Sequence, residues 1–265
     1  MSSKNPKRQD TTSAAQRKLE TLRILEAEGT VRVSGLSRRF QVTEETIRRD
    51  LERLENEGAV VRTHGGAVFN RNREQYESPA VQRETQNLEE KKAIVEYALS
   101  LIEPGDVIAL DASTTCLHLV KQLPNRSLTV LTYSLAIANE LVQKTEINVI
   151  LIGGYLDRDS MANTGIHAEK MVESYHVDKF LFSCHGFDLT RGLTEPSEAH
   201  VQLKKKIIEI SDELILLTDS TKFRRKSLVR LMGMEDLNRF VTDDQLPQEA
   251  IQDLQDMGVD VIVVE

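Results

Sequence analysis

The chain has 265 residues but only two cysteines, and it contains no run of apolar residues as long as a membrane-spanning helix requires. Cys116 and Cys184 lie far apart in the sequence, which argues against a disulfide framework and favours a reducing compartment. The N-terminal segment MSSKNPKRQDTTSAAQ lacks the apolar stretch of a secretory signal, and we interpret residues 1–14 as a disordered tail. Because no membrane segment is expected either, the sequence predicts a cytoplasmic protein.

Several catalytic and cofactor-binding motifs are also missing from the sequence. No nucleotide-binding P-loop, nucleophile elbow or dinucleotide fingerprint follows any predicted strand. The pairs Cys116 with His118 and Cys184 with His185 do not have the spacing of zinc ligands. We therefore expect no cofactor and no metal ion, although these four side chains leave a metal or redox switch as an alternative.

Positive charge is unevenly distributed. The formal net charge is −8, yet residues 1–75 contain 15 Lys and Arg against 11 Asp and Glu, whereas the rest contains 19 against 31. A basic N-terminal part attached to an acidic body suggests that only the N-terminal part contacts a polyanion. The length favours two domains, and 40% apolar residues are enough for a sizeable core.

The N-terminal part has the pattern of three helices. Apolar residues at helical spacing predict a first helix that includes Leu19–Leu25 and ends at Gly29. A short second helix is predicted over 33–40, and the connection QVT leads to Thr43, which we expect to cap the third helix. This order of helices is typical of helix-turn-helix domains, in which the last helix enters the major groove.

The third predicted helix buries one face and exposes the others. Ile47, Leu51 and Leu54 fall on one face at i, i+4 and i+7. Arginine suits bidentate contacts with guanine or phosphate. The alternative is a solvated face on which the arginines only pair with glutamates one turn away. The residues assigned to DNA binding are Thr43, Thr46, Arg48, Arg49 and Arg53.

The segment AVVRTHGGAVF predicts a β-hairpin directly after the third helix, because two short β-prone runs are separated by THGG. We expect Gly65 and Gly66 to supply the positive φ angles of a tight turn. The hairpin would be the wing of a winged helix-turn-helix, with Arg62 and His64 against backbone phosphate or in the minor groove.

At this point the sequence resembles a known family. The segment TEETIRRDLERLENEGAVVRTHGGAV is similar to the N-terminal signature of DeoR-type bacterial transcriptional regulators, in which TIRRDL is followed by R-x-x-GGA. The resemblance implies a winged helix-turn-helix repressor over residues 15–70, with a sugar-phosphate sensor domain toward the C-terminus. It also implies that the arginines contact operator DNA.

Residues 71–87 are polar and have little periodicity, so we expect a linker there. From residue 88 to 265, apolar strand patterns alternate with helical patterns, which indicates an α/β domain with an open, mostly parallel sheet covered by helices on both faces. The predicted strands are DVIALD, LTVLTY, NVILIGG, KFLFSCHGFD, ELILLTDS, RFVTDD and VDVIVVE.

Ligands of such sheets bind at the carboxyl ends of the strands, where small hydroxyl residues that open a helix can hold a phosphate. Lys222 would add a point charge for the same anion, and Asp111 or Asp188 could accept hydrogen bonds from sugar hydroxyls. Each of these residues could instead merely cap the next helix. The candidate effector-binding residues are Asp111, Ser113, Thr114, Thr115, Tyr133, Gly153, Gly154, Gly186, Asp188 and Lys222.

The DeoR resemblance extends over nearly the whole chain. DASTTCLHL is similar to the Asp-x-Gly-Thr-Thr phosphate loop of the family, and GGYLDRDSMANTG, GFDLTRGLTEPSEAHVQLKKKII and DSTKF resemble its later signatures. These imply a fold like that of ribose-phosphate isomerases and glucosamine-phosphate deaminases. Ser113, Cys116 and Tyr133 depart from the usual Gly, Thr and Asn. DASTTC with FSCHG looks most like fucose-operon regulators, which implies a deoxyketose 1-phosphate effector.

The leading hypothesis is a repressor of a carbohydrate-catabolism operon that a phosphorylated sugar releases from its operator. The expected partners are double-stranded DNA, the effector and further copies of the chain, as a dimer or tetramer, with no membrane partner. The alternative is a sugar-phosphate isomerase or deaminase on the same scaffold, in which Asp111 or Asp188 would be the general base. An enzyme, however, has no need of a recognition helix and a wing.

Overall fold

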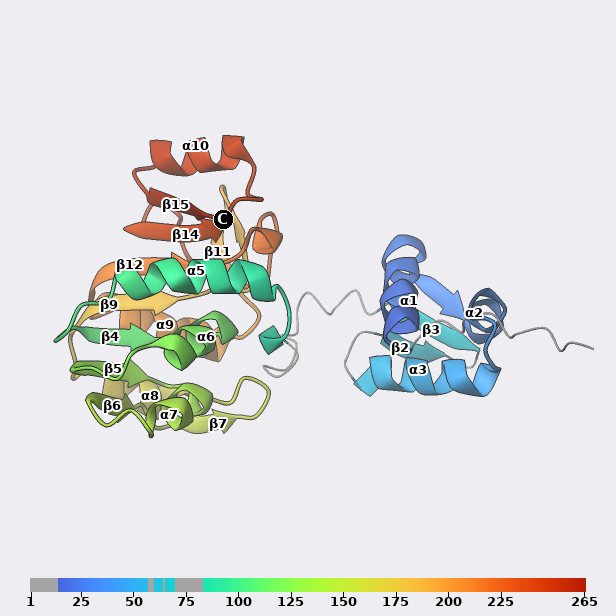
Figure 1. Cartoon of the computed structure of the whole chain (residues 1–265), viewed down its shortest axis with the longest axis horizontal. Coiled ribbons are helices and arrows are strands. Elements are labelled where there is room, and N and C mark those ends of the chain that lie inside the picture. Colours follow the sequence, from blue (N-terminus) through green and yellow to red (C-terminus); the bar gives the residue numbers. More distant parts are fainter. Residues whose placement is uncertain (1–13, 57–59, 64, 70–82) are drawn as a thin grey trace, which may run out of the picture. The chain divides into compact units, whose positions relative to one another are not determined.

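The computed structural model describes residues 14–56, 60–63, 65–69 and 83–265. The chain divides into two compact units, residues 1–73 and 74–265, which we call the head and the body (Figure 1). The predicted tail lies outside the described residues up to position 13, and so does most of the predicted linker. No helix in the described part of the chain is long and apolar enough to cross a membrane.

The head contains the three predicted helices and the predicted hairpin. Its elements are α1 (Ala14–Glu28), β1 (Thr30–Arg32), α2 (Val33–Phe40), α3 (Glu44–Asn56), β2 (Val60–Thr63) and β3 (Gly66–Phe69). Gly29 ends α1 with a φ of 75° while its N–H donates to the carbonyl of Leu25 at 2.8 Å. Thr43 caps α3, because its hydroxyl accepts the Thr46 N–H at 3.2 Å.

One strand of the head was not predicted from the sequence. Three residues, Thr30–Arg32, form β1, which pairs antiparallel with β3 and completes a three-stranded sheet in the order β1-β3-β2. The expectation that Gly65 and Gly66 supply positive φ angles is wrong. Neither Gly65 nor Gly66 has a φ in the left-handed region; Gly66 instead lies so close to β1 that a Cβ atom would stand 1.9 Å from the Val31 carbonyl oxygen.

The body is built on the predicted parallel sheet. Its seven strands follow the order β15-β14-β12-β9-β4-β5-β6, and every neighbouring pair is parallel. All seven predicted strand segments contribute to it. The strands are β4 (Val107–Leu110), β5 (Leu128–Thr132), β6 (Ile147–Leu151), β9 (Val177–Phe182), β12 (Ser211–Leu217), β14 (Arg239–Asp243) and β15 (Asp260–Val264).

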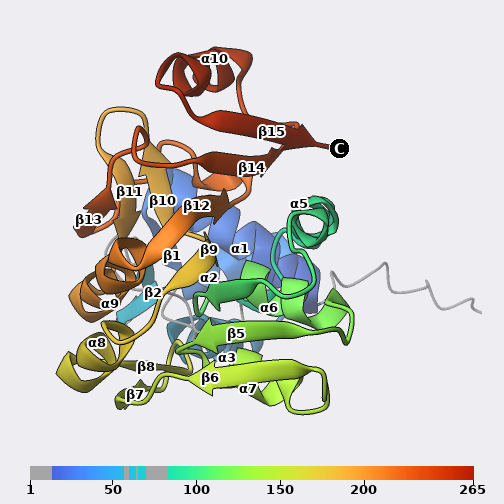
Figure 2. The same ribbon diagram turned by 90° about the vertical axis from the view of Figure 1, so that its left-hand side faces the viewer.

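Helices cover both faces of this sheet, as expected for strands that are apolar on both sides (Figure 2). Alternate residues of β9 show the division, because Leu181 packs toward one face while Phe180 and Phe182 pack toward the other. The helices on the Leu181 side are α5 (Leu88–Ser100), α6 (Thr114–Gln122) and α7 (Leu135–Leu141). Those on the Phe180 side are α8 (Ile166–Val172), α9 (Glu198–Glu209) and α10 (Gln248–Asp256).

Two small antiparallel sheets are additions that the sequence patterns did not predict. The predicted strand KFLFSCHGFD divides into β9 and β10 (Gly186–Asp188), and β10 turns away to pair with β11 (Gly192–Glu195). β11 also pairs with β13 (Val229–Met232). A hairpin of β7 (Tyr155–Asp157) and β8 (Ala162–Thr164) follows β6. These elements border the carboxyl ends of the central strands.

Candidate functional site

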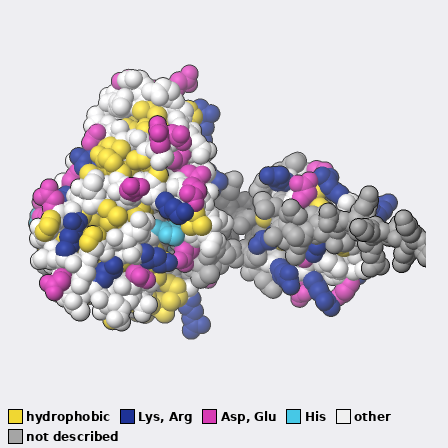
Figure 3. Space-filling view, in the orientation of Figure 1, with side chains coloured by type: hydrophobic (Ala, Val, Ile, Leu, Met, Phe, Trp, Pro, Cys, Tyr) yellow, Lys and Arg dark blue, Asp and Glu magenta, His cyan; other side chains and the backbone are white. Residues whose placement is uncertain are grey.

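The polar face of α3 is a candidate DNA-binding surface. Arg48 and Arg49 expose 50% and 71% of their side chains. Arg48 pairs with Glu44 at 2.8 Å, and Arg49 pairs with Glu45 at 3.5 Å. Exposed pairs of this kind are worth at most about 1 kcal/mol, so phosphate or guanine could replace the glutamates at little cost. Figure 3 shows Lys and Arg side chains on the α3 side of the head, with acidic side chains between them.

The wing adds fewer groups to this surface. The Arg62 guanidinium lies 3.9 Å from the Glu55 carboxylate, which also accepts the Arg62 backbone N–H at 3.2 Å. Arg53 and Gly65 are exposed, whereas His64 lies outside the described residues. The ion pairs expected from the solvated-face alternative are therefore present, and the DNA contacts of these residues remain predictions.

We expect Arg48→Ala or Arg49→Ala to weaken specific DNA binding by about 1–3 kcal/mol where the arginine contacts a base, and to reduce the salt dependence where it contacts phosphate. Glu52→Ala, on the same exposed helix, is the control for folding. Fluorescence anisotropy with operator DNA at several salt concentrations measures both quantities. Unchanged affinity and salt dependence in both arginine variants would exclude this face of α3 from the interface.

The body contains a cavity of about 110 Å³ at the carboxyl ends of four adjacent strands, β12, β9, β4 and β5. The central strand β4 has β5 on one side and β9 on the other, so the cavity lies at a topological switch point, where open α/β sheets bind ligands. Among the predicted effector-binding residues, those that line it are Asp111, Ser113, Thr114, Tyr133 and Lys222.

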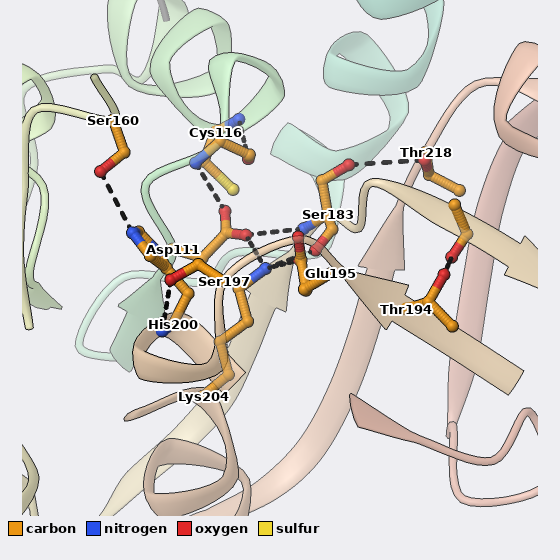
Figure 4. Close-up of polar contacts among 12 residues, drawn as sticks. Asp111, Cys116, Ser160, Ser183, Thr194, Glu195, Ser197, His200, Lys204 and Thr218 are labelled. Carbon is orange, nitrogen blue, oxygen red and sulfur yellow. Dashed lines mark hydrogen bonds and ion pairs between the residues drawn. The ribbon is translucent and has the colours of Figure 1, made fainter. Parts of the chain in front are cut away.

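The floor of the cavity is a buried ion-pair network around Lys204 (Figure 4). The Lys204 ammonium lies 2.8 Å from Asp111 Oδ2 and 2.5 Å from Glu195 Oε1, and it donates to the Ser183 carbonyl at 2.8 Å. All three charged side chains are at least nine-tenths buried. Burial alone would lower the pKa of Lys204, but the two carboxylates hold it well above the ordinary value. Lys204 therefore stays protonated near neutral pH.

Asp111 also fixes the loop that begins α6. Its Oδ1 accepts the Ser113 N–H at 3.0 Å and its Oδ2 accepts the Ser183 N–H at 3.1 Å. Ser113 in turn caps α6, because its hydroxyl accepts the Cys116 N–H at 3.1 Å. Burial would raise the pKa of Asp111, but Lys204 and these donors hold it below the ordinary value. The N-terminus of α6 is thus preset at the cavity wall, as phosphate binding requires.

Four further cationic side chains line the cavity, together with the carboxylate of Asp219. Lys222, which follows β12, donates to the Ser183 hydroxyl at 3.0 Å, and Lys91 of α5 is 4% exposed. Burial, followed by the charge of Lys222, lowers the pKa of Lys91 to about 8. Arg83 and Arg225 line the same cavity. An anion placed here would face several positive charges at short range.

Hydroxyl and imidazole side chains complete the lining. The Tyr133 ring is fully buried and meets His200 edge-on, with ring centroids 6.0 Å apart. The Tyr133 hydroxyl has no hydrogen-bond partner among the described residues, and burial raises its pKa. His200 Nε2 lies 3.1 Å from the Ser160 hydroxyl. Burial lowers the pKa of His185, which also lines the cavity, to about 4, so that its ring is neutral near neutral pH. These groups can exchange hydrogen bonds with ligand hydroxyls.

Five predicted effector-binding residues do not line this cavity. Thr115 is buried in α6, and Gly186 belongs to β10. Gly153 and Gly154 follow β6, which lies beyond β5 in the sheet. Asp188 closes the β10–β11 turn, where its carboxylate accepts the hydroxyl and N–H of Thr190 and the N–H of Arg191. The Thr190 hydroxyl is the main cause that lowers the pKa of Asp188 to about 2.

Sequence reasoning missed part of the lining. His200 and Lys204 stand four residues apart on the buried face of α9, and Lys91 stands in line with the apolar residues of α5. A charged residue on an apolar face was the signal that could have found them. Residues 83–87, predicted as linker, contribute Arg83, Gln86 and Asn87 to the cavity wall. Glu195 and Ser183 come from segments whose role depends on the tertiary fold.

The cysteines do not form a reactive pair in this structure. Both thiols are free and buried, and the Cys116 thiol donates to the Leu181 carbonyl at 3.3 Å. Burial raises the pKa of both, to about 12 for Cys184, so neither is a thiolate near neutral pH. Within the described residues, no group of three or more His, Cys, Asp and Glu side chains is arranged to hold a metal ion.

Comparison with known proteins assigns both units. Residues 17–73 match the DeoR-like helix-turn-helix domain, and residues 86–244 match the DeoR C terminal sensor domain. The chain belongs to the DeoR family. A DeoR-family protein with both domains is a transcriptional regulator with a sugar-phosphate sensor domain, so the resemblance inferred from TIRRDL and DASTTC is confirmed.

The chain matches several transcriptional regulators over most of their length. The chain is 42% identical to the uncharacterised HTH-type transcriptional regulator YulB of Bacillus subtilis, over 94% of this chain and 96% of the relative. It is 35% identical to the HTH-type transcriptional repressor GlcR of the same organism, over 85% and 87%. It is 34% identical to the L-fucose operon activator of Haemophilus influenzae, over 85% and 90%.

Comparison with solved structures gives only remote matches. Ribose 5-phosphate isomerase A of Methanocaldococcus jannaschii matches 53% of this chain and 56% of its own, with a TM-score of 0.40 and 18% sequence identity. The predicted architecture, a helix-turn-helix followed by a parallel α/β domain, is confirmed by the sheet topology and by the family domains.

Proposed function

We propose that this DeoR-family regulator represses a carbohydrate-catabolism operon and is released from its operator by a phosphorylated sugar. The observation that carries the proposal is the cavity at the carboxyl ends of the strands, which the capped N-terminus of α6 and Lys222 both line. Helix N-termini and lysines are standard phosphate ligands. The ligand's hydroxyls would face Tyr133, His200 and the carboxylate of Glu195.

Local capture of the phosphate is necessary because the body as a whole repels anions. Residues 76–265 contain 19 Lys and Arg against 31 Asp and Glu. Long-range attraction therefore cannot concentrate a sugar phosphate in the cavity, and specificity must arise from groups in contact with it. A free sugar leaves these donors without their anion, so we expect it to bind far more weakly than its phosphate.

The same geometry disfavours catalysis by Asp111. Its carboxylate is 1% exposed and already accepts from Ser113, Ser183 and Lys204, and its pKa is low. A general base must reach the proton that it removes. The second candidate, Asp188, lies in the β10–β11 turn and does not line the cavity. Both observations favour a sensor over an isomerase.

We further propose that the regulator acts as a homo-oligomer, as a dimer or tetramer. One helix-turn-helix head contacts few base pairs, and pairing two heads over two half-sites is the usual way to extend an operator. Repression, rather than activation, follows if the bound heads block transcription. Among the relatives, GlcR is named a repressor and the L-fucose regulator an activator.

Thr114→Val and Lys222→Met are expected to give a regulator that binds operator DNA but no longer responds to sugar phosphates. Thr114→Val keeps the shape of the side chain and removes a hydroxyl at the α6 N-terminus; Lys222→Met removes a cation. Each substitution should weaken binding of the sugar phosphate by roughly tenfold or more. The test uses labelled DNA from the region upstream of the gene that encodes this chain. Sugar phosphates from a panel are titrated into its complex with the protein, and fluorescence anisotropy measures release of the DNA.

Lys226→Met is the matched control for Lys222→Met, since Lys226 is 55% exposed, pairs with Asp188 and does not line the cavity. It should release DNA like the parent. If both cavity variants release DNA at the same sugar-phosphate concentrations as the parent, the assignment of the phosphate to α6 and Lys222 is contradicted. A parent that no member of the panel releases would contradict the proposed effector class.

A further inference from the structure

One edge of the body carries an exposed apolar surface. Strand β6 is the last strand of the parallel sheet, so in the described part of the chain no other strand pairs with its outer side. The β7–β8 hairpin and α8 follow it in the chain and lie along the same edge of the body (Figure 1, Figure 2). Five large apolar side chains from these elements are between 38% and 67% exposed, and we call them the β6-edge surface: Leu151, Tyr155, Leu156, Met161 and Ile166.

The free edge of β6 lacks the features that usually keep an edge strand from pairing. Such strands are protected by lysine, by proline or by a bulge, whereas β6 has the sequence INVIL and pairs with β5 in a regular register. The opposite edge strand, β15, carries the Arg239–Asp260 ion pair and a single exposed large apolar residue, Val263. Exposed apolar side chains that gather in one place mark an interaction surface. We therefore expect a partner on the β6 edge.

The hairpin that contributes most of this surface is fixed to the body. The Asn163 N–H donates to the Tyr133 carbonyl at 2.8 Å, and the Asn163 amide donates to the Ile152 carbonyl at 2.9 Å. The Leu135 N–H donates to the Met161 carbonyl at 2.9 Å. The surface is thus formed before a partner arrives, and docking does not have to order the hairpin.

The charges of the hairpin favour a second copy of this chain as the partner. Arg158 and Asp159 are exposed neighbours at the turn, and neither forms an ion pair with another described residue. A two-fold interface brings each residue opposite its counterpart's neighbour, so Arg158 of one copy can pair with Asp159 of the other, twice. Residues 76–265 contain 19 Lys and Arg against 31 Asp and Glu, so two bodies repel at long range and need a locally balanced surface to associate.

We propose that a second copy of this chain docks on the β6-edge surface through a two-fold interface, with the five apolar side chains at its centre and Arg158 and Asp159 at its rim. A standard interface buries about 800 Å² of each partner and has this division into apolar centre and polar rim. The proposal rests on the proposed function, since it names the surface through which the regulator becomes a homo-oligomer. Two bodies joined at this edge carry two heads, as two half-sites require.

Sedimentation equilibrium of the full chain over a series of concentrations measures the association. Leu156→Glu and Ile166→Glu should each raise the dissociation constant by about 100-fold or more, because a charge then enters the apolar centre of the interface. Both side chains are about half exposed, and a glutamate at the start of α8 suits the helix dipole. Val263→Glu is the matched control, since Val263 is 40% exposed on the opposite edge strand. It should associate like the parent.

A charge exchange tests the two-fold arrangement itself. Arg158→Asp places two acids on each hairpin and Asp159→Arg places two bases there, so each variant alone should associate about tenfold more weakly than the parent. An equal mixture of the two variants should associate with the parental affinity, because both ion pairs form again across the mixed interface. Damage to the fold of either variant would not be repaired by mixing.

Two results would overturn the surface but leave the proposed homo-oligomer standing. They are an oligomeric parent whose dissociation constant is unchanged in both glutamate variants, or a mixture of the charge variants that associates no better than either variant alone. If a glutamate variant does not fold, the mixture still decides the proposal. A parent that is monomeric both free and on operator DNA would overturn the surface and the proposed oligomer together.

Discussion

Full-length protein with Gly66→Ala is expected to lose specific operator binding, whereas Gly65→Ala is expected to retain it. A Cβ atom on Gly66 would lie 1.9 Å from the Val31 carbonyl oxygen, 2.9 Å from the Val31 carbonyl carbon and 3.0 Å from Arg32 Cα. All three are backbone atoms, so no side chain can move to make room. Pairing of β1 with β3 must break, and the wing then loses its place beside α3.

Gly65 provides an internal control one residue away. A Cβ atom there meets nothing within 4 Å, although the Gly65 carbonyl still accepts the Val33 N–H at 2.9 Å. Hydrogen exchange of the full chain should show faster exchange of 30–32 and 66–68 in Gly66→Ala alone, with the body unchanged. Normal protection of both strands in this variant would show that the close approach of β1 is unimportant.

Lys204→Met is expected to reduce the free energy of unfolding of the body by about 3–5 kcal/mol, the usual cost of leaving buried charges without a partner. Asp111 and Glu195 are 1% and 7% exposed and would face each other without the ammonium between them. Lys206→Met is the matched control on the same helix, since Lys206 pairs with Glu209 and Glu173 at the surface. It should leave the stability of the body close to that of the parent, because exposed ion pairs contribute little.

The deficit of Lys204→Met should shrink as the pH falls. The pKa of Asp111 is lowered in the folded parent, so its ionisation stabilises the parent at neutral pH, and this contribution is lost as the pH falls through the folded pKa. In the variant, burial without Lys204 raises the pKa of Asp111, so acid relieves the buried charge. Urea unfolding at neutral and at acid pH measures both effects. A deficit that is constant with pH would exclude the ion pair as its origin.

The parallel sheet was predictable because its signal is local. Each of the seven strands contains a short apolar run, and β4, β5, β9, β12 and β14 are followed directly or within two residues by polar residues. The recognition helix was equally clear, since Ile47, Leu51 and Leu54 mark a buried face and Thr43 marks its start. Such patterns depend on residues a few positions apart, which is what a sequence displays directly.

The rest could not be found in this way, because it depends on distant segments. β1 is only three residues long and becomes a strand because β3 lies beside it. β10 leaves the line of β9 to pair with β11. Asp111 and Lys222 were predicted at strand ends, but Lys204 and Glu195, which complete the charges around Asp111, come from α9 and β11. Gly153 and Gly154 after β6 and Asp188 at the end of β10 looked equivalent to the residues that line the cavity until the strand order separated them.

The central claim, that the cavity of the body recognises the phosphate of a sugar phosphate, is tested most directly by calorimetry with matched ligands. Each sugar phosphate that releases operator DNA is titrated into the full chain beside its free parent sugar. The phosphate should bind at least about 100-fold more tightly than the free sugar, and Thr114→Val or Lys222→Met should remove most of that difference. Equal binding of the phosphate and the free sugar, or parental titration of both variants, would contradict the account.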